Sequence, residues 1–460
     1  MGFIDEDYLI TSANGKSLFA KISGLPIVDA HSHIEAEQIA TNNGWRDIWE
    51  VEGATDHYVW ELMRRSGVRE NYITGDASNR EKWLALAEVF PSFAGNPVYD
   101  WLHLDLRRRF KIDTVLGPKT GAVIWEESSS LLKDERFRPR NLLKQMGVEI
   151  LCTTDSPTSE LNWHKLIQEK LPGIRVLPTW RPDIATDIGS SEWKVFLRQL
   201  SERTDIEILH LPDFLEALKN THDLFTSVGC IASDHAFEQP WGDYVSEKAA
   251  ARIFERALHC RNITESDRTT FSAFMLHFFG TLDSQAGLVM QLHIGAVRNY
   301  RNQLLNTLGR DSGGDIASHN IELVNNLRNF LNEFDGHLQI VLYGLHPSHI
   351  YSLATLTRAF PNVYMGAPWW FMDNPYHMHE HLAQVASVDL LANHTGMVTD
   401  SRKLFSYESR TEMFRRVLAD FLGNWVDQGR IPFSVAEGLA VKIAYYRPKQ
   451  LFFSGAESND

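Results

Sequence analysis

Residues 27–36 read IVDAHSHIEA, a short apolar run that ends in two histidines one residue apart. Side chains two positions apart on a β-strand share one face. If residues 25–29 form a strand, His31 and His33 therefore point the same way at its carboxyl end, as two ligands of one metal ion must. The alternative is a strand end at which one histidine is solvated and the other caps a loop.

The same pattern recurs along the chain, where short apolar runs end in polar or aromatic clusters and helix-like stretches separate them. Apolar strands that alternate with helices indicate a parallel sheet. Eight such units fit an α/β protein of the closed (β/α)8 TIM-type barrel class, whose sites lie at the carboxyl ends of the strands. An open doubly wound sheet is the alternative, although no GxGxxG follows any run. The runs are residues 25–33, 148–157, 174–183, 229–237, 288–299, 338–347, 362–370 and 395–403.

Residues 35–145 separate the first two predicted strands and are far too many for an ordinary crossover. They contain helix-like patterns, and helix-start signals precede residues 80 and 121. We therefore predict a barrel domain made of residues 1–34 and 146–460, with residues 35–145 as a large helical insertion packed beside the barrel mouth. The helix-like patterns are residues 56–68, 79–90, 99–110 and 121–134 in the insertion, and 186–227 and 241–285 beyond it.

The composition is that of a globular protein, because 43% of the 460 residues are hydrophobic and 23% are charged. The formal net charge of −14 argues against a protein that binds nucleic acid through phosphate contacts. No apolar run approaches the roughly 20 residues that span a bilayer, and the acidic N-terminus lacks the apolar core of a signal peptide. Three cysteines without a CxxC pair fit a reducing compartment. These features predict a cytoplasmic protein that binds neither nucleic acid nor membranes.

Asp400, near the end of the last predicted strand, supplies a third possible metal ligand. In a closed barrel the last strand pairs with the first, so Asp400 would lie beside His31 and His33. Imidazole and carboxylate groups are common ligands of Zn²⁺, Mn²⁺ and similar ions. We predict one divalent metal, with Zn²⁺ as the first choice and Mn²⁺ or another ion as the alternative. Asp400 could instead be a helix N-cap.

Other predicted strand ends carry charged side chains. Arg181 and Arg402 are candidate anion-binding residues, because a guanidinium binds a carboxylate or phosphate through two parallel hydrogen bonds. They favour a specific anionic substrate. His293 could be a further metal ligand, a hydrogen-bond partner of the substrate, or a satisfied core histidine. Asp234 and His235 could form a pair that supports the site from behind, or a simple loop turn.

Aromatic residues add two further candidates. His57 and Tyr58 could be a proton-transfer pair that the insertion brings over the barrel mouth, or a helix start with a core aromatic. Trp369, Trp370 and Phe371 could form a wall against the carbon skeleton of the substrate, or pack beneath a loop. The chain has no GxSxG nucleophile motif and no phosphate-binding P-loop. The residues therefore indicate metal-assisted or acid–base chemistry on a small polar anion.

Across residues 27–416 the sequence resembles the uronate (glucuronate) isomerase family, a divergent branch of the amidohydrolase superfamily. The resemblance implies a distorted barrel with a helical insertion and a homo-oligomer. It implies an isomerase that converts D-glucuronate to D-fructuronate, D-galacturonate to D-tagaturonate, or both, through an enediol. The motifs that carry it, in order, are DAHSHI, DIWEVEGATDHYVWELMRRSGV, YITGDASNREKW, GNPVYDWLHLDLRRRF, TTDSP, VLPTWRPD, SDHAF, LHIGAVRN, WWFMDN and TDSRKLFSY.

The resemblance also implies residue roles. Metal hydrolases of the superfamily often bridge two metals with a modified lysine, and the strand ends here show no lysine in that place, which favours a single metal. The implied metal ligands are His31, His33 and Asp400. The implied catalytic residues are Asp400, Tyr58, His57 and Arg402. The implied substrate-binding residues are Arg181, His293, Trp369, Trp370 and Arg298.

Two stretches depart from the family pattern. Ser156 stands where the family usually has a second aspartate, which weakens any role for that acid. Residues 408–416 lack a histidine and a tyrosine of the usual motif, so we expect no catalytic duty from that helix. Two rival functions are a metal-dependent hydrolase of a sugar-acid lactone or amide, which would want more metal ligands, and a sugar-acid binding protein without catalysis.

Overall fold

The computed structural model describes residues 3–453 and contains two parallel sheets. The first has the order β1-β2-β3 and the second the order β4-β5-β8-β9, while β6 and β7 form an antiparallel hairpin. Residues 1–2 and 454–460, the ends of the predicted barrel domain, lie outside the described residues. The strands are β1 (Ile27–Asp29), β2 (Val148–Cys152), β3 (Arg175–Leu177), β4 (Ala232–Phe237), β5 (Val289–Ile294), β6 (Ala296–Val297), β7 (Ile316–Ala317), β8 (Gln339–Gly344) and β9 (Val363–Met365).

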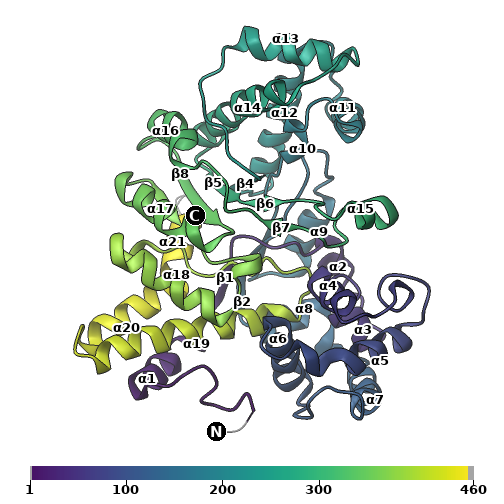
Figure 1. The fold of residues 1–460 in the computed structure, drawn as a ribbon, viewed down its shortest axis with the longest axis vertical. Helices are drawn as coiled ribbons and strands as arrows, with labels where there is room; N and C mark the ends of the chain where they lie inside the picture. The colour runs from purple at the N-terminus through teal and green to yellow at the C-terminus, as the bar shows by residue number, and fades with distance from the viewer. Residues whose placement is uncertain (1–2, 454–460) are drawn as a thin grey trace.

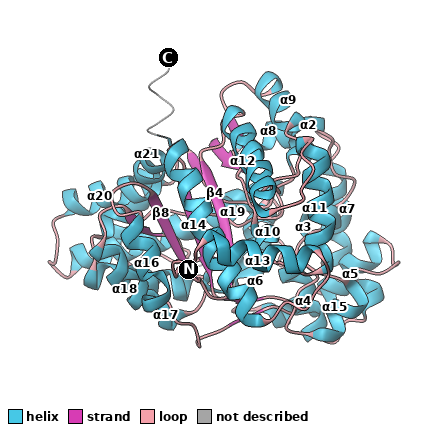
Figure 2. Ribbon diagram, turned by 90° about the horizontal axis from the view of Figure 1, so that it is seen from above, coloured by secondary structure: helices cyan, strands magenta, loops and turns pink. Residues whose placement is uncertain are grey.

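The position of β5 inside the four-stranded sheet agrees with its largely apolar sequence. Every residue of β5 is buried, and β5 pairs in parallel with β4 on one side and β8 on the other. A strand buried on both faces has no solvated face, so it reads as a nearly continuous apolar run. Helices surround the strands in the interior of the molecule (Figure 2).

Backbone contacts also link the two sheets. Trp180, just beyond β3, bridges to both Asp155 and Ser233, which joins the first sheet to β4. At the other side, the amide of Thr395 donates to the carbonyl of Met365 at 3.1 Å. The segment after Thr395 then reaches the end of β1, as described for the site below.

Seven of the eight predicted runs contain a strand, but the prediction of a strand within residues 395–403 is wrong. Gly396 and Asp400 have φ angles of 81° and 48° in that segment. Left-handed residues turn the backbone out of the extended form, so the regular ladder cannot continue through them. The β6–β7 hairpin was not predicted, because two-residue strands leave no periodic pattern.

The stretch between β1 and β2 is helical, as predicted. Ser78 accepts from the amide of Glu81, and Glu81 bonds back to Ser78, in a capping box that begins α5. Figure 1 shows α3–α7 grouped on one side of the molecule, at the lower right. The helices are α2 (Ala36–Thr41), α3 (Ile48–Glu52), α4 (His57–Arg65), α5 (Asn79–Val89), α6 (Pro97–Asp105), α7 (Gly121–Leu131) and α8 (Pro139–Gln145), with short turns η1 (Glu70–Tyr72), η2 (Phe90–Phe93), η3 (Leu106–Phe110) and η4 (Glu135–Phe137).

The remaining helices lie before β1 or between and after the later strands, and α1 packs against α19. No helix among residues 3–453 is long and apolar enough to cross a membrane. The helices are α1 (Ala13–Ile22), α9 (Asn162–Lys170), α10 (Asp183–Thr186), α11 (Ser191–Thr204), α12 (Leu211–Ser227), α13 (Glu247–Leu258), α14 (Glu265–Ala286), α15 (Asn302–Leu308), α16 (Val324–Glu333), α17 (Pro347–Ala359), α18 (Pro375–Val388), α19 (Ser406–Asp427), α20 (Phe433–Val441) and α21 (Arg447–Phe453), with short turns η5 (Trp370–Met372), η6 (Leu391–Asn393) and η7 (Lys442–Tyr446).

Candidate functional site

Backbone bonds place Asp400 beside the two histidines. The amide of Asp400 donates to the carbonyl of His31 at 3.2 Å, and the amide of His33 donates to the carbonyl of Ser401 at 2.9 Å. Asp29, the last residue of β1, accepts from the hydroxyl of Thr399 at 2.6 Å. These bonds join the end of β1 to the segment around Asp400, so the last predicted run lies beside the first as expected, although it is not a strand.

The three predicted metal ligands form one compact group. The Nε2 atoms of His31 and His33 each lie 3.2 Å from Oδ1 of Asp400. Burial lowers the pKa of His33 to about 3, so its imidazole is neutral near pH 7. Burial alone would raise the pKa of Asp400, but hydrogen bonds from His31 and His33 hold it well below its usual range. Imidazole nitrogens and an ionised carboxylate are suitable donors for a divalent cation.

A second possible ligand group shares His31. Nδ1 of His293 lies 2.6 Å from Asp234, whose other carboxylate oxygen is 3.4 Å from Nδ1 of His31. All three side chains are at most 2% exposed. Nε2 of His293 is buried without a hydrogen-bond partner among the described residues. Arg181 lies 3.1 Å from Asp234. Burial alone would raise the pKa of Asp234, but Arg181 and then the neighbouring histidines lower it strongly.

For Asp234 and His235 the loop-turn interpretation is wrong, and of the supporting pair only Asp234 lies behind the site. The two residues lie on β4 rather than in a turn, and successive strand residues point to opposite faces. Asp234 faces His31 and His293, whereas His235 lies 2.8 Å from the hydroxyl of Ser233 on the other face. Asp234 therefore belongs to the site and His235 does not.

The insertion brings His57 and Tyr58 to the same site. Asp56 caps α4 by accepting from the amide of Tyr58 at 3.0 Å, which places both aromatic residues on its first turn. Their rings stack with centroids 4.7 Å apart. The hydroxyl of Tyr58 donates to Asp400 at 3.4 Å. Burial lowers the pKa of His57 to about 4 and raises that of Tyr58, so both side chains are uncharged near pH 7.

Trp369 and Trp370 are both 3% exposed and close one side of the site. Trp369 packs against His293, with ring centroids 4.6 Å apart, and Trp370 lies 5.7 Å from the ring of His57. The guanidinium of Arg298 lies 4.5 Å above the ring of Trp370. A cation held over an indole face gains electrostatic stabilisation and a fixed position.

A cavity of about 420 Å³ opens beside His33 and contains the predicted arginines. Within it, Arg402 lies 3.5 Å from Asp311, and Arg298 lies 3.4 Å from Asp315. Side-chain exposures of 24% for Arg402 and 35% for Arg298 leave both guanidinium groups accessible to a small anion. The lining residues are His33, Thr154, Arg181, Asp183, Ala236, Arg298, Asn299, Arg310, Asp311, Asp315 and Arg402.

Arg410 reaches the site although the sequence analysis expected no catalytic duty from α19. Its Nη1 donates to Asp373 at 3.0 Å and to the carbonyl of Thr399 at 2.7 Å. Its guanidinium lies 5.2 Å from the ring of Tyr58. The sequence offers one signal for Arg410, namely an arginine on the side of a helix that is otherwise buried. Its partners are distant in sequence and cannot be identified from the chain alone.

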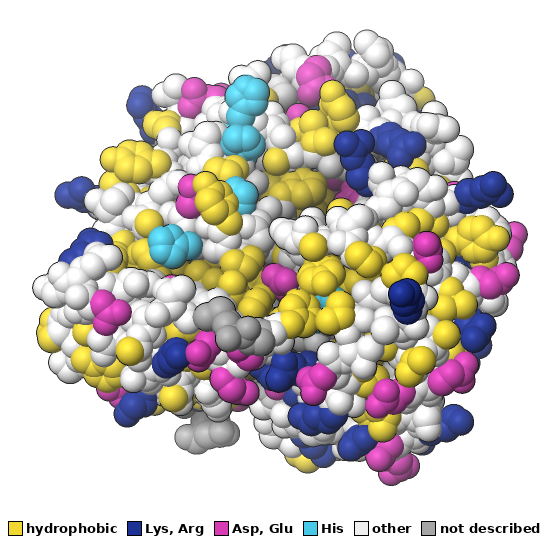
Figure 3. All heavy atoms as spheres, turned by 60° about the horizontal axis from the view of Figure 1, so that its bottom comes forward, with side chains coloured by type: hydrophobic (Ala, Val, Ile, Leu, Met, Phe, Trp, Pro, Cys, Tyr) yellow, Lys and Arg dark blue, Asp and Glu magenta, His cyan; other side chains and the backbone are white. Residues whose placement is uncertain are grey.

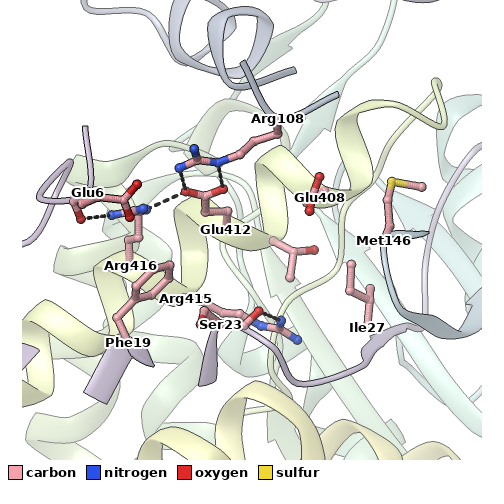
Figure 4. A pocket seen from close by; sticks show the side chains of 11 residues that line it. Glu6, Phe19, Ser23, Ile27, Arg108, Met146, Glu408, Glu412, Arg415 and Arg416 are labelled. Atoms are coloured by element: carbon pink, nitrogen blue, oxygen red, sulfur yellow. Dashed lines mark hydrogen bonds and ion pairs between the residues drawn. The ribbon is translucent and has the colours of Figure 1, made fainter. Parts of the chain in front are cut away.

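Five other residues of the departing stretch face another cavity, of about 250 Å³, at the amino-terminal end of β1 (Figure 4): Glu408, Thr411, Glu412, Arg415 and Arg416. Arg108 makes two hydrogen bonds of 2.8 and 2.6 Å to Glu412, which also accepts from Arg416 at 2.8 Å. Glu408 pairs with Arg109. These charged side chains are largely paired with one another, and the pairs hold α19 against η3. They lie away from the histidines, which are at the other end of β1.

The fold and the site together define an α/β protein with imidazoles and carboxylates at the ends of parallel strands, beside an arginine-lined cavity. The chain belongs to the glucuronate isomerase family, whose sequence profile matches residues 1–452. The uronate isomerase of Thermotoga neapolitana is 52% identical over 451 residues, which cover 98% of this chain and 100% of that protein. The family indicated by the motifs is therefore confirmed.

Solved structures agree with this assignment. The crystal structure of uronate isomerase from Thermotoga maritima has a TM-score of 0.97 and 51% identity, covering 98% of this chain and 100% of that chain. Glucuronate isomerase from Caulobacter crescentus has a TM-score of 0.94 at 28% identity, covering 98% and 97%.

Proposed function

We propose that this isomerase interconverts hexuronates and their ketoses, D-glucuronate with D-fructuronate and D-galacturonate with D-tagaturonate. The observation that carries the proposal is family membership over nearly the whole chain together with a largely buried His–His–Asp group beside a cavity lined by four arginines. An aldose–ketose isomerisation needs acid–base groups at C1 and C2, and a uronate also needs a partner for its carboxylate. The chain offers both kinds of group in one cavity.

We infer further that the strands close into the (β/α)8 barrel of the amidohydrolase superfamily, with residues 35–145 as an inserted unit. The bridges through Trp180 and the bonds at Thr395 and Asp400 support closure. A separate hydrophobic cluster also supports it, because successive strands and the last segment contribute to it. That cluster includes Val28, Ile150, Leu177, Ala232, Val289, Val341, Ala367 and Val398.

A single divalent metal, Zn²⁺ or Mn²⁺, fits the residues at the site. His31, His33 and Asp400 would hold it, since their donor atoms lie within 4.8 Å of one another. Burial alone would lower the pKa of His31, but Asp234 and then Asp400 raise it, so the site stabilises positive charge. The unpartnered Nε2 of His293 is a further possible donor. When bound, such an ion polarises substrate oxygen atoms.

The arginines would bind the carboxylate of the substrate. A guanidinium forms two parallel charge-assisted bonds with a carboxylate. Arg402 pairs at 3.5 Å with Asp311, whose side chain is 64% exposed, so a substrate carboxylate can replace that weak partner. Arg181 is held by Asp183 and Asp234, which gives the cavity a fixed cationic wall. Arg298 and Trp370 would then contact the sugar from the adjoining side.

Proton transfer would follow from the ionisation states of the site. Asp400 is ionised, so it can take the proton of the anomeric hydroxyl and deliver it, directly or through the adjoining imidazole, to the ring oxygen as the bond between C1 and that oxygen breaks. A base then removes the C2 proton and returns it to C1 through a cis-enediol. Tyr58 keeps its proton because burial raises its pKa, so it can donate a hydrogen bond to the developing enediolate oxygen. Arg410 would hold the ring of Tyr58 in place through its guanidinium, which lies 5.2 Å from the ring centroid.

The test of this function is turnover of D-glucuronate and D-galacturonate by the purified protein, followed by ketose formation, with metal analysis of the same sample. We expect a ketose from at least one of the two sugars. In D2O, we expect solvent deuterium at C1 of the product, because the enediol exchanges its proton. Formation of no ketose, with hydrolysis of a sugar-acid lactone instead, would favour the hydrolase alternative.

Replacing Arg402 with lysine is expected to lower kcat/KM by about 10²-fold, because the charge remains but the bidentate fork is lost. The proposed contact is to the substrate carboxylate, so KM for the uronate should rise while the fold is unchanged. A matched control is Arg430→Lys, because Arg430 lies over the ring of Trp425 far from the cavity. Steady-state kinetics on both variants provides the measurement. Wild-type KM in Arg402→Lys would remove Arg402 from the carboxylate site.

We also propose a cytoplasmic location and a homo-oligomeric assembly, as the composition and the family resemblance suggested. Sedimentation of the purified protein is the direct measurement of its assembly.

A further inference from the structure

Histidine side chains gather on one face of the molecule (Figure 3). Among the described residues, His319, His346 and His349 form a cluster outside the candidate active site. The ring centroids of His319 and His346 are 6.0 Å apart, and those of His346 and His349 are 5.5 Å apart. His319 follows the β6–β7 hairpin, whereas the other two residues begin α17 after β8. The cluster therefore connects two segments that are distant along the backbone.

His349 has the hydrogen bonding of a metal ligand. It is 6% exposed, and its Nε2 lies 3.1 Å from the backbone carbonyl of His319. A carbonyl can only accept, so Nε2 carries the proton and Nδ1 presents a lone pair. Nδ1 is buried without a hydrogen-bond partner among the described residues. Histidines that bind metals commonly donate their other ring N–H to a carbonyl in this way.

The ligand nitrogens of the three histidines do not all lie within 4.8 Å of one another in the described structure, but the rings are close enough to share one ion once the accessible side chains turn. Two imidazoles with metal–nitrogen bonds of about 2.1 Å in tetrahedral geometry have ring centroids about 5 Å apart. The observed centroid separations of 6.0 and 5.5 Å are slightly larger, and rotation of an accessible side chain can close the difference. His319 is exposed and His346 is half-buried, so both rings can turn toward Nδ1 of His349. In the structure Nδ1 of His346 accepts from the amide of Ser348 at 3.2 Å, so binding through Nε2 requires the ring proton to move to Nδ1, which would then donate to the hydroxyl of Ser348, 2.8 Å away.

We propose that His319, His346 and His349 form a second metal site, which binds a divalent transition metal of the imidazole-preferring class such as Zn²⁺, Ni²⁺ or Cu²⁺. The bound ion would tie the segment that follows the β6–β7 hairpin to the start of α17. Arg298, Asp311 and Asp315 lie before or within that hairpin and line the active-site cavity. The ion would thus anchor the cavity wall from outside, without contacting the substrate.

The experiment is a calorimetric titration of the chelator-treated, untagged, full-length protein with Ni²⁺. The test variant is His319→Asn/His346→Asn, which keeps the backbone carbonyl at 319 and an N-capping side chain at 346. We expect it to bind one equivalent of Ni²⁺ fewer than the wild type. The control is His337→Asn/His379→Asn, two exposed histidines elsewhere on the surface, and it should match the wild type.

An unchanged number and affinity of Ni²⁺ sites in the test variant would overturn the proposal. The difference between variant and wild type does not depend on how many ions the active site takes. The test variant should also keep wild-type turnover of glucuronate in the presence of the active-site metal. A failure of the second site and a failure of the proposed isomerase activity are therefore separate results.

Discussion

Replacing Asp400 with asparagine is expected to lower kcat on glucuronate by on the order of 10³-fold or more, with the fold intact. Removal of a general base alone typically costs about 10²–10⁴-fold. Here the change also removes the carboxylate to which His31, His33 and Tyr58 all point, at 3.2, 3.2 and 3.4 Å. The loss should appear in kcat because these contacts act on the reacting atoms.

Asparagine is the suitable replacement because Asp400 has a φ angle of 48°. Asparagine tolerates left-handed backbone better than most other residues, so the chain around Thr399 and Ser401 should keep its course. The control is Asp113→Asn, since the Asp113 side chain is 73% exposed and pairs with Arg107 far from the histidines. Circular dichroism and metal content complete the measurement. Wild-type kcat in Asp400→Asn would refute the role proposed for Asp400.

The sequence pattern was sufficient to predict the arrangement of β1 and Asp400. A parallel barrel places its first and last strands together, so His31, His33 and Asp400 could be assigned to one place without coordinates. The prediction failed for the secondary structure of residues 395–403, because Gly396 and Asp400 are left-handed. No propensity argument identifies a left-handed aspartate, since its conformation is imposed by the contacts of Thr399 and His31.

The contributions of Asp234 and Arg410 were harder to predict for different reasons. Strand alternation separates Asp234 from His235, but the face of each depends on the register of β4, which the sequence does not set. Arg410 is buried in α19 through Asp373, a partner 37 positions away. A buried arginine in an apolar helix pattern indicates that a carboxylate lies nearby, but not which one.

Replacing Lys403 with methionine is expected to lower the free energy of unfolding by about 3–5 kcal/mol, because it leaves buried carboxylates without their cation. Lys403 is 6% exposed, and its Nζ lies 2.6 Å from Glu52 and 3.4 Å from Asp56. Glu52 is fully buried. The control is Lys449→Met, which removes an ion pair to Glu149 at 29–32% exposure and should cost less than about 1 kcal/mol.

The deficit of Lys403→Met should also depend on pH, and its sign follows from the carboxyl groups. Burial raises the pKa of Glu52 and of nearby Asp105, while Lys403 lowers both, so removing the lysine raises these pKa values further. A raised carboxyl pKa means that the folded state binds protons more readily than the unfolded state. Stability is then favoured at low pH and falls as pH rises toward the folded pKa.

We therefore expect the deficit, measured by urea unfolding, to be larger at about pH 8 than at about pH 5, because protonation neutralises the orphaned carboxyl groups. Adding Glu52→Gln should recover part of the loss, since it removes a charge that no longer has a partner. A deficit that is equal at both pH values and unaffected by Glu52→Gln would mean that Lys403 stabilises the fold by packing its methylene groups and not by its charge.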